Sequence, residues 1–429
     1  MHCVQYLALL LAGLLALSHS YPLEEQAGRD DSFNATFERL QFNAYDAPSR
    51  KVAPSNIDFA FRLYHLIASQ SSGKNIFFSP ISISTALAML SLGAGGDSRT
   101  QILKSLGFNL TELPLPIIHE GFRFTQRVLS LPIGEVNTYV GNALVLSQDL
   151  EPLPEFTRDT KGSYNTELLR TDFRDVEGTT QLINHYVKEK THGMITNFVS
   201  GGLSPDIKMV LLNYIYFQGL WVKPFPFSGV VVRDFHVDEN TVVKVPMMLQ
   251  DQREHWYIHD KRVPCSVLRM DYRGEAVAFF ILPREGKMKE VEQVLSPGML
   301  ERWNRLLQHR YFYRTVELYL PKFSISNSYA LDQILPDLGF QDLFSSRANF
   351  SGITKQEKLK LSKSLHKATL EVNEIGTKAA ATTRSFFSLY SAHYYNRVLM
   401  FNRPFFIVIF STSAQTIIFL GKVFNPTAP

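Results

Sequence analysis

The chain has 429 residues, 45% of them hydrophobic and 20% charged, so it can bury a large core and has an ordinary globular composition. Its 44 basic and 40 acidic residues leave a formal net charge of +4. This excess is too small to indicate nucleic-acid binding, and no run after the first twenty residues is long and apolar enough to predict a membrane span.

An apolar segment at the start of the chain predicts secretion. Residues 7–17 are apolar apart from one glycine, too few to cross a bilayer, and the small Ser18 and Ser20 then offer a cleavage site. We therefore expect residues 1–20 to be a signal peptide and the mature chain to be soluble and extracellular. Three Asn-x-Ser/Thr sequons are expected glycan sites: Asn34, Asn109 and Asn349.

Cysteine use predicts a fold without disulfides. Cys3 would leave with the signal peptide, so Cys265 would remain alone. A free thiol or a buried apolar-side residue would both explain Cys265, and its residue type favours the buried position. A chain of this length can hold together through its core.

Helices are predicted mainly in the first half of the chain. A polar tail, residues 21–54, has little periodicity and is expected to be disordered. The sequence SNID at Ser55 can cap a helix. The helix has an apolar stripe at the right spacing: Ile57, Ala60, Phe61, Tyr64, Ile67 and Ala68. Residues 75–94 predict a short strand, then a buried helix, and residues 181–195 an amphipathic helix ended by Gly193.

Strands are predicted in the second half. Residues 210–221 and 278–283 are continuous apolar runs, as buried central strands require. Residues 316–325 alternate and predict one half-buried strand. The apolar segments 405–410 and 416–423 suit a hairpin. Helices first and strands later, with no internal repeat or linker, predict one α+β domain.

The sequence lacks familiar motifs of catalysis, metal binding and cofactor binding. The sequence has no G-x-S-x-G elbow, no C-x-x-C pair and no Walker loop. HEGFR at His119 lacks the second histidine of a zinc helix. We therefore expect a protein that is not an enzyme and that needs no metal or cofactor.

Several separated motifs resemble the serpin family over residues 55–426. They are NIFFSPISIS, INHYVKEKTHGMI, LLNYIYFQGLW, VPMM, LYLPKFSI, LHKATLEVNEIGTKAAAT, FNRPFFIVIF and LGKVFNP. The signal peptide and the FNRPFFIVIFSTS ending are most similar to the plasma antitrypsin-like branch. The resemblance implies a single domain at residues 55–429, with three β-sheets, about nine helices and an exposed reactive-centre loop at about residues 374–397.

The resemblance also implies a mechanism. A target serine protease attacks the loop as its substrate and forms an acyl-enzyme through its own serine. The cut loop then inserts into the central sheet as a new strand and distorts the protease before deacylation. The expected partners are thus serine proteases, and the inhibitor is expected to be a monomer without catalytic groups.

The sequence of the loop can be tested against this mechanism, because alternate side chains of an inserted strand face the core. The inward set contains no charge: Thr377, Ala379, Ala381, Thr383, Ser385 and Phe387. Lys378 and Arg384 have the opposite parity and would face outward. Burying either charge would cost on the order of several kcal/mol, so this pattern favours insertion.

The resemblance assigns roles within the loop. The expected hinge is Glu374, Gly376, Thr377, Ala379, Ala380 and Ala381. The same register places the scissile bond between Tyr390 and Ser391, with Leu389 supporting the fit. An aromatic residue at this position predicts chymotrypsin-like or tissue-kallikrein-type targets. Two departures are Lys378, where inhibitory relatives have an acid, and Ile375, where a small or polar residue is common.

An alternative is a non-inhibitory serpin that carries a hydrophobic hormone or other ligand. The alanines and threonines of the hinge weigh against it, because non-inhibitory members often lose them. A polar cluster beneath the sheet, the shutter, is expected at Ser79, Ser82, Asn213 and His366. Its hydrogen bonds would set how easily the sheet opens, although His366 also fits an ordinary satisfied core histidine.

A basic cluster suggests a second partner. It consists of Arg302, Arg305, His309, Arg310 and Arg314. Arg302, Arg305 and His309 share one helical face. Some members of the family bind heparin with this helix and the next strand, and clustered cations attract sulfated polymers. This chain has Arg314–Thr315 where a paired basic doublet is expected, so a solvated charged face explains the cluster equally well.

Overall fold

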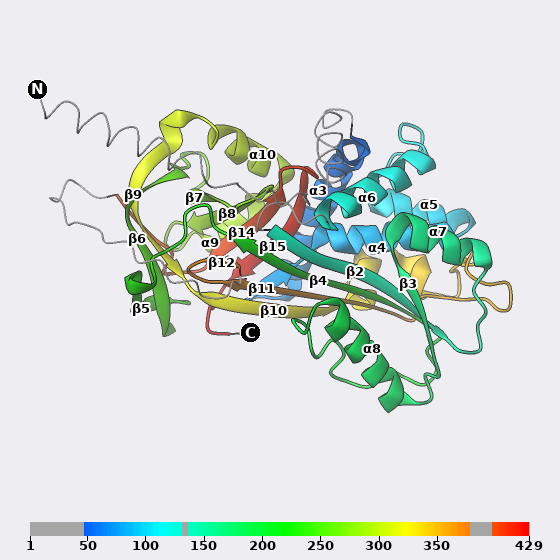
Figure 1. Ribbon diagram of the computed structural model, residues 1–429. Helices are drawn as coiled ribbons and strands as arrows, with labels where there is room; N and C mark the ends of the chain where they lie inside the picture. The colour runs from blue at the N-terminus through cyan, green and yellow to red at the C-terminus, as the bar shows by residue number, and fades with distance from the viewer. Residues whose placement is uncertain (1–46, 131–135, 378–396, 429) are drawn as a thin grey trace, which may run out of the picture. The chain divides into compact units, whose positions relative to one another are not determined.

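Eight α-helices and two β-sheets make up the part of the chain that the computed structural model describes, residues 47–130, 136–377 and 397–428 (Figure 1). Ala47–Pro429 forms one unit. The predicted signal peptide and most of the predicted tail lie outside the described residues. Among the residues described, no helix combines the length and the apolar character needed to cross a membrane.

The helices are mostly in the first half, as predicted. They are α3 (Pro48–Gln70), α4 (Pro80–Gly93), α5 (Gly96–Ser105), α6 (Leu115–Ser130), α7 (Pro154–Tyr164), α8 (Val176–Lys190), α9 (Met288–Val294) and α10 (Pro297–Leu306). Short 3₁₀ helices occur at η1 (Phe227–Gly229), η2 (Arg310–Phe312), η3 (Leu331–Gln333), η4 (Leu335–Leu338) and η5 (Gln341–Phe344).

Helix α3 begins seven residues before the predicted start at Ser55, so residues 48–54 are helical and the prediction of a disordered tail was wrong there. Pro48 suits a first turn, where its missing N–H is not needed. Packing also stabilises this start. Val52 is fully buried, and a Cβ added to Gly121 of α6 would lie only 2.6 Å from its side chain. A glycine in α6 thus lets the two helices approach closely.

Helix α4 is buried as predicted. It follows β1 (Ile76–Phe78), and the Ser79 hydroxyl oxygen caps it by accepting a hydrogen bond from the Ser82 N–H at 3.4 Å. Nearly every position of α4 is buried, because the helix lies inside the main core. This cap also brings two predicted shutter residues together.

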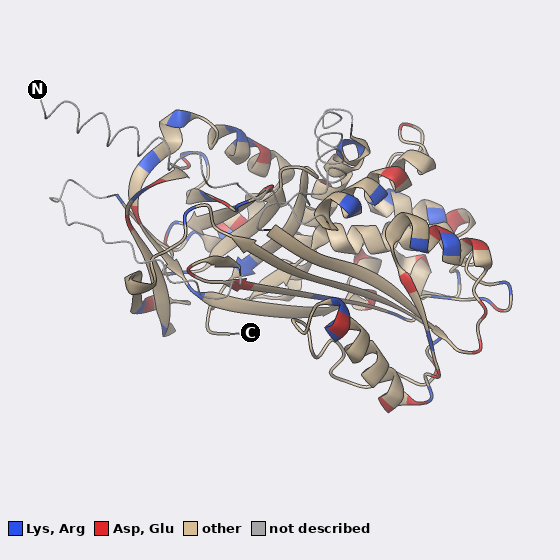
Figure 2. Ribbon diagram, in the orientation of Figure 1, with Lys and Arg blue, Asp and Glu red and all other residues tan. Residues whose placement is uncertain are grey.

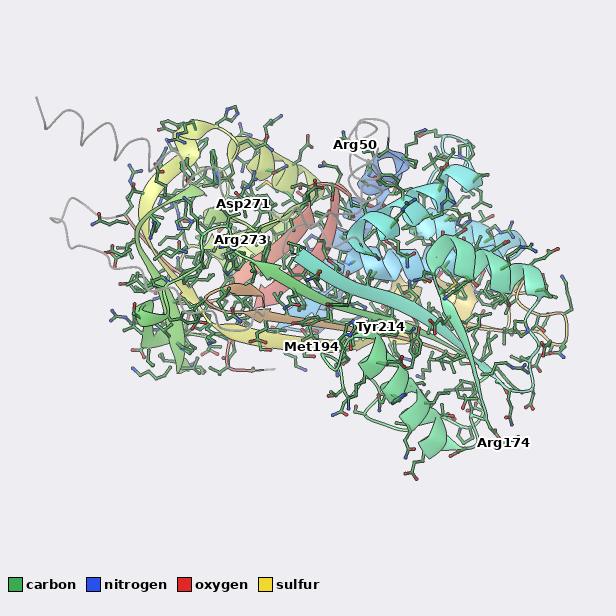
Figure 3. All side chains as sticks on the ribbon, viewed as in Figure 1. Arg50, Arg174, Met194, Tyr214, Asp271 and Arg273 are labelled. Carbon is green, nitrogen blue, oxygen red and sulfur yellow. The ribbon has the colours of Figure 1, made fainter. Side chains whose placement is uncertain are left out.

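A six-stranded sheet holds the candidate site. Its order is β10 (Phe323–Ala330), β11 (Lys363–Val372), β4 (Met209–Leu220), β2 (Val136–Ser147) and β3 (Glu167–Thr171), with β12 (Gly376–Thr377) also paired to β4. Helix α8 covers part of one face (Figure 1). There Tyr214 of β4, labelled in Figure 3, meets Tyr186 of α8 edge to face, with 6.2 Å between ring centroids. The other face belongs to the main core.

A nine-stranded sheet forms the rest. Its order is β1, β15 (Thr416–Val423), β14 (Phe405–Ser411), β8 (Ala276–Pro283), β7 (Cys265–Asp271), β6 (Val242–His259), β9 (Tyr313–Pro321) and β13 (Val398–Met400), with β5 (Val230–His236) paired to β6. The β14–β15 hairpin was predicted. Strand β6 is long, with a register shift between Gln250 and Arg253. It joins two of the three expected sheets into one hydrogen-bonded ladder.

The prediction of one strand over residues 316–325 was wrong. The segment is two strands, β9 and β10, which lie in different sheets and meet at Lys322. Pro321 cannot donate a backbone hydrogen bond, so the ladder is interrupted there. The Lys322 N–H instead donates to the Pro246 carbonyl at 2.8 Å. The junction places Lys322 beside Glu374, in the segment that follows β11.

Candidate functional site

The candidate site is the seam between β4 and β11, the two central strands of the six-stranded sheet. These strands are parallel and pair from Lys363↔Val210 to Thr369↔Tyr216. Beyond Thr369 they no longer pair with each other. At this open end, β12 pairs antiparallel with β4 through Gly376↔Leu220 and Thr377↔Gly219. A two-residue strand therefore lies at the mouth of the seam (Figure 1).

A tight turn returns the chain from β11 into the seam. The side-chain oxygen of Asn373 accepts hydrogen bonds from the N–H groups of Ile375 at 3.1 Å and Gly376 at 3.2 Å. The Asn373 N–H donates to the Gly376 carbonyl at 2.8 Å. A Cβ at Gly376 would collide with the carbonyl oxygen of Gly219. Only glycine allows this approach, which supports the predicted hinge position.

The segment after β4 anchors the turn. The Trp221 N–H donates to the Ile375 carbonyl at 2.8 Å, and its indole N–H donates to the Asn373 carbonyl at 3.2 Å. Trp221 is fully buried and stacks on Tyr272 with 4.2 Å between ring centroids. The start of the predicted hinge is therefore fixed to the end of β4 by backbone and side-chain hydrogen bonds.

Glu374, a predicted hinge residue, is nearly buried and forms an ion pair. Both of its carboxylate oxygens lie 3.2 Å from Nζ of Lys322. Its carbonyl accepts a hydrogen bond from the Phe225 N–H at 2.8 Å. Sequence reasoning missed Lys322, because its place depends on the β9–β10 junction.

Most of the predicted loop falls outside the described residues. The structure describes the backbone of Thr377 but not residues 378–396. The predicted hinge residues Ala379, Ala380 and Ala381 and the predicted reactive bond at Tyr390–Ser391 therefore lie outside it. The chain is described again from Arg397, whose carbonyl accepts a hydrogen bond from the Glu317 N–H at 2.9 Å, just before β13.

All four predicted shutter residues come together beneath the seam. His366 Nδ1 lies 2.5 Å from the Asn213 side-chain oxygen, and its Nε2 accepts from the Ser79 N–H at 3.1 Å. The Ser82 hydroxyl donates to the same Asn213 oxygen at 2.6 Å. Burial lowers the pKa of His366 to about 3, so the imidazole is neutral at physiological pH.

Asn142 of β2 belongs to this network, although sequence reasoning missed it. Its side-chain oxygen accepts from the Asn213 amide at 2.6 Å. The two residues lie opposite each other in the β2–β4 ladder, a pairing that no sequence spacing reveals. The network thus spans β2, β4, β11 and the start of α4.

The predicted basic cluster is divided by the structure. Arg302 is mostly buried and pairs with Asp260, which also accepts a hydrogen bond from the Trp303 indole N–H at 2.7 Å. Arg305, His309 and Arg310 are exposed. Basic residues gather where α10 ends and β9 begins (Figure 2). Arg302 is therefore structural, and the other residues form a cationic surface.

Aromatic rings support this surface. Arg314, half-buried, lies with its guanidinium 4.3 Å from the ring centroid of Tyr311, and Arg310 lies 5.0 Å from that of Tyr313. Tyr311 is 73% exposed, so it can also offer a face to a ligand. Lys261 and Arg262, exposed in the turn that contains Asp260, extend the cationic surface.

Two sequons and the remaining cysteine lie within the described residues. Asn109 and Asn349 are exposed, and the side-chain oxygen of each accepts from the N–H two residues on, at 3.2 Å in both turns. Cys265 is buried and free, and burial raises the pKa of its thiol to about 12. Asn34 lies outside the structure. The described ranges hold no group of three or more His, Cys, Asp or Glu residues arranged for a metal ion.

An open pocket of about 530 Å³ lies between α3, α10 and the nine-stranded sheet. Its apolar lining is Ala53, Pro54, Ile57, Phe279, Pro297, Leu300 and Phe410. Its polar lining is Arg50, Asp58, Glu301, Asn304 and Gln415. The sequence did not predict this pocket, because its walls come from distant segments. An apolar pocket with a few polar groups has the composition of a small-molecule site.

The family model described as serpin (serine protease inhibitor) matches residues 54–426. Kallistatin from Homo sapiens is 57% identical over 429 residues, 100% of both chains. A crystal structure of human glycosylated kallistatin has a TM-score of 0.85 and 59% identity, covering 89% of this chain and 100% of that one. From the sequence we expected a serpin of the plasma antitrypsin-like branch that resembles kallistatin, and these matches confirm that resemblance.

Hormone carriers match as well. Corticosteroid-binding globulin from Bos taurus is 45% identical over 381 residues, 89% of this chain and 92% of its own. A structure of human thyroxine-binding globulin has a TM-score of 0.83 and 41% identity, covering 89% of this chain and 100% of that one. A structure of cleaved kallistatin complexed with heparin has a TM-score of 0.74 and 60% identity, covering 77% and 96%.

Proposed function

The chain belongs to the serpin family, and we propose that its function is that of a secreted suicide inhibitor of serine proteases. In this function a protease cleaves the loop, and the loop then inserts between β4 and β11. The chain supplies no catalytic group: its loop serves as the substrate, and insertion of the cut loop keeps the protease in a covalent complex. The full-length similarity to kallistatin supports secretion, and the exposed sequons support glycosylation.

The seam is the observation that carries the proposal. Strands β4 and β11 run parallel, while β12 starts to enter between them in the opposite direction. A strand inserted along the whole seam would replace one parallel pairing by two antiparallel ones, which are slightly more stable per residue. The sheet thus has a thermodynamic reason to accept another strand.

The register of β12 continues into a chemically suitable path. Each step from Gly376↔Leu220 along the loop moves one step back along β4, so Thr383 would reach Asn213 and Phe387 would reach Met209, the first residue of β4. The ten steps from Thr377 span about 34 Å. Tyr390, the new end of the cut loop, would then lie beyond the far end of the strand and carry the attached protease there, while Ser391 would stay with the segment that leads to β13.

Shutter chemistry fits this motion. Asn213 and His366 lie opposite each other across the seam, and a strand that passed between them would separate them. Their buried hydrogen bonds hold the closed sheet together. We infer that the network sets part of the barrier to insertion.

Tyr390–Ser391 is the proposed reactive bond, and chymotrypsin-like proteases or tissue kallikrein are the proposed targets. A Tyr390 side chain suits an apolar specificity pocket, with Leu389 adding apolar contact. We further propose heparin as a partner of the surface formed by Arg305, His309, Arg310 and Arg314. Cleaved kallistatin complexed with heparin supports this partner.

Hormone carriage is the second candidate function, and the pocket between α3 and α10 favours it. The pocket combines apolar walls with Arg50 and Glu301, which suits an amphipathic ligand. The similarity to corticosteroid-binding and thyroxine-binding globulins supports this candidate. It does not exclude inhibition, because the pocket and the seam are formed by different strands.

One experiment separates the two functions. The secreted chain is incubated briefly with chymotrypsin and, separately, with tissue kallikrein, and is then analysed on a denaturing gel. A covalent band near the summed masses supports inhibition and ranks the targets. Cleavage after Tyr390 without such a band would reject inhibition of these proteases. Binding of cortisol or thyroxine that persists in Tyr390→Pro would then favour carriage.

A further inference from the structure

A small pocket of about 120 Å³ lies where the segment after β4 meets β6, β7 and the start of β9. Val222 and Lys223 form one wall, short runs of β6 and β7 form the others, and Tyr313 closes the side toward β9. The volume is well below the roughly 300 Å³ at which pockets for drug-sized ligands begin, so only water and small ions fit. The pocket shares no lining residue with the larger pocket beside α3.

One wall carries a buried histidine that lacks a hydrogen-bond partner. His255 of β6 is only 4% exposed, and its Nε2 atom has no partner among the residues that the structure describes. Buried polar atoms in folded proteins nearly always have a partner, which can be protein, water or a bound ion. A group inside the pocket that hydrogen-bonds to the imidazole would therefore stabilise this arrangement.

Lys223 holds a cation at the same pocket. Its Nζ donates to the Glu254 carbonyl at 2.7 Å and to the Tyr313 hydroxyl, and it lies 4.7 Å from the centroid of the Tyr313 ring. These contacts fix the position of the ammonium group. Because an ammonium group has three protons, one remains for a further acceptor once these two bonds within the described chain are formed.

The two acids of the pocket do not oppose an anion strongly. Asp271, labelled in Figure 3, is paired with Arg269 of the same strand at 2.7 Å. Glu254 is exposed, so water and salt screen its carboxylate.

The electrostatic environment of His255 is instead cationic. Burial, and less strongly the charges of Lys223 and Arg253, lower the pKa of this histidine to about 4. The ring is therefore neutral at physiological pH and still has one N–H to donate. A neutral donor in a positive potential suits an anionic acceptor.

We propose that this pocket binds one small oxyanion, of the sulfate or phosphate class, between the imidazole of His255 and the ammonium group of Lys223. The anion would accept the ring N–H and the third ammonium proton, so the unpartnered histidine gains a partner. The site goes beyond protease inhibition and does not depend on it. Since Lys223 follows Trp221 by two residues, the anion would also tie the segment that anchors the turn before β12 to β6.

This chemistry has two sources. Arg310 lies 5.0 Å from the ring centroid of Tyr313, so the pocket borders the cationic surface at the end of α10. A free ion fits the site, and so does one sulfate group of a polymer that lies on that surface. Both present the same oxygen acceptors.

Equilibrium dialysis with labelled inorganic sulfate tests the site, with sodium chloride added to hold the ionic strength constant. The intact chain should bind one sulfate saturably at millimolar concentrations. Lys223→Met should weaken binding about tenfold, as expected for the loss of a charge-assisted hydrogen bond. Lys244→Met is the matched control on β6, since its side chain is 72% exposed, and it should keep the original affinity.

The pH dependence tests the contact with His255. Sulfate keeps its charge between pH 7.5 and 5, so a change in affinity over this range comes from the protein. A bound anion raises the pKa of the imidazole, and binding should therefore tighten at least about twofold as the pH falls. His255→Gln retains a donor but cannot titrate, so it should bind sulfate with an affinity that does not change with pH.

Heparin-column elution of the same variants distinguishes the two sources. If Lys223→Met weakens sulfate binding and elutes like the unmodified chain, the site takes free ions. If it also elutes at lower salt, as Arg310→Gln should, the site takes a sulfate group of the polymer. Absence of saturable sulfate binding, or equal affinity of Lys223→Met and Lys244→Met, would overturn the site. A tightening at low pH that persists in His255→Gln would overturn the contact with the imidazole.

Discussion

Glu374 and Lys322 form an ion pair of 3.2 Å that joins the start of the predicted hinge to the junction between β9 and β10. The carboxylate is nearly buried, whereas the lysine side chain is 43% exposed. The pair therefore stabilises the open end of the seam at the edge where Lys322 is in contact with solvent. Because Lys322 lies between two sheets, the pair also couples the hinge to both of them.

Replacing Glu374 by lysine should destabilise this end of the seam. The change puts two cations together near buried backbone, and we expect the free energy of unfolding to fall by about 1–2 kcal/mol, less than for a fully buried pair because Lys322 is partly solvated. Urea denaturation measures the loss. Lys322→Glu combined with Glu374→Lys should recover part of it, and equal stability of all variants would refute the argument.

A charge on the inward parity should block insertion. Thr377→Arg would place a guanidinium at the level of Gly219, on the parity that faces the main core. Burying this unpaired charge would raise the free energy of the inserted state by on the order of several kcal/mol. The inhibitor should become a substrate that chymotrypsin cleaves without a covalent band. Thr377→Ser is the matched control and should still trap. Full trapping by the arginine variant would refute the insertion register.

Arg384 should slow insertion, although its parity is outward. The register brings it to the level of Leu212 and Leu365, on the half of the face that α8 and its following segment cover, and two residues from Lys367. Arg384→Ser should therefore stabilise the cleaved chain by about 1–2 kcal/mol while leaving the intact chain unchanged. Thermal midpoints of both forms provide the measurement. An unchanged cleaved form would show that the covering segment moves away.

Acid should destabilise the fold through its buried histidines. Burial lowers the pKa of His366 from 6.5 to about 3, and burial also lowers those of His119 and His255 to about 4. Between these values and 6.5 the unfolded chain binds protons that the fold does not, so stability falls as the pH decreases through this range. Each group contributes up to about 1.4 kcal/mol per pH unit.

His366→Gln should flatten this pH dependence between about pH 6 and 4, where the wild-type slope includes the imidazole. Urea unfolding midpoints at several pH values measure this pH dependence. The exposed His309→Gln is the control and should keep the wild-type slope. A His366 variant with the full slope would mean that other groups carry the effect.

Heparin affinity should depend on the exposed residues of the basic cluster and not on Arg302. Arg305→Gln and Arg310→Gln should each weaken binding severalfold and reduce its salt dependence, because each removes an exposed cation from the surface. Arg302→Gln should instead lower stability, since it leaves Asp260 partly unpaired. Heparin-column elution and thermal midpoints separate the two effects. Equal elution of all three variants would refute this division.

The sequence predicted elements well where one local pattern decides them. Helix α4 and the β14–β15 hairpin follow from continuous apolar segments. The start of α3 and the split of residues 316–325 were missed, because a contact with Gly121 and a change of sheet at Lys322 decide them. Both depend on segments far away in sequence, which no local pattern contains.

The same limit applies to the site. Family motifs named the four residues that meet beneath the seam and the glycine of the turn, Gly376, whose proposed roles stay predictions. Asn142 and Lys322 could not be named in this way, because strand register brings them to the site. Arg302 looked like a surface cation on the helical face, but its pairing with Asp260 requires the β6–β7 turn to reach α10. Residue type shows which interactions a side chain can form, and the tertiary fold decides which residue it contacts.

The parallel seam between β4 and β11 has a consequence for how long the intact protein lasts. If the loop inserts as we propose, the intact protein is folded without having reached its lowest free energy. Its lifetime at body temperature is therefore set by the height of an activation barrier and not by an equilibrium constant. Heating rate, storage time and chaperone-free refolding should thus change the fraction of active molecules even when no residue is altered.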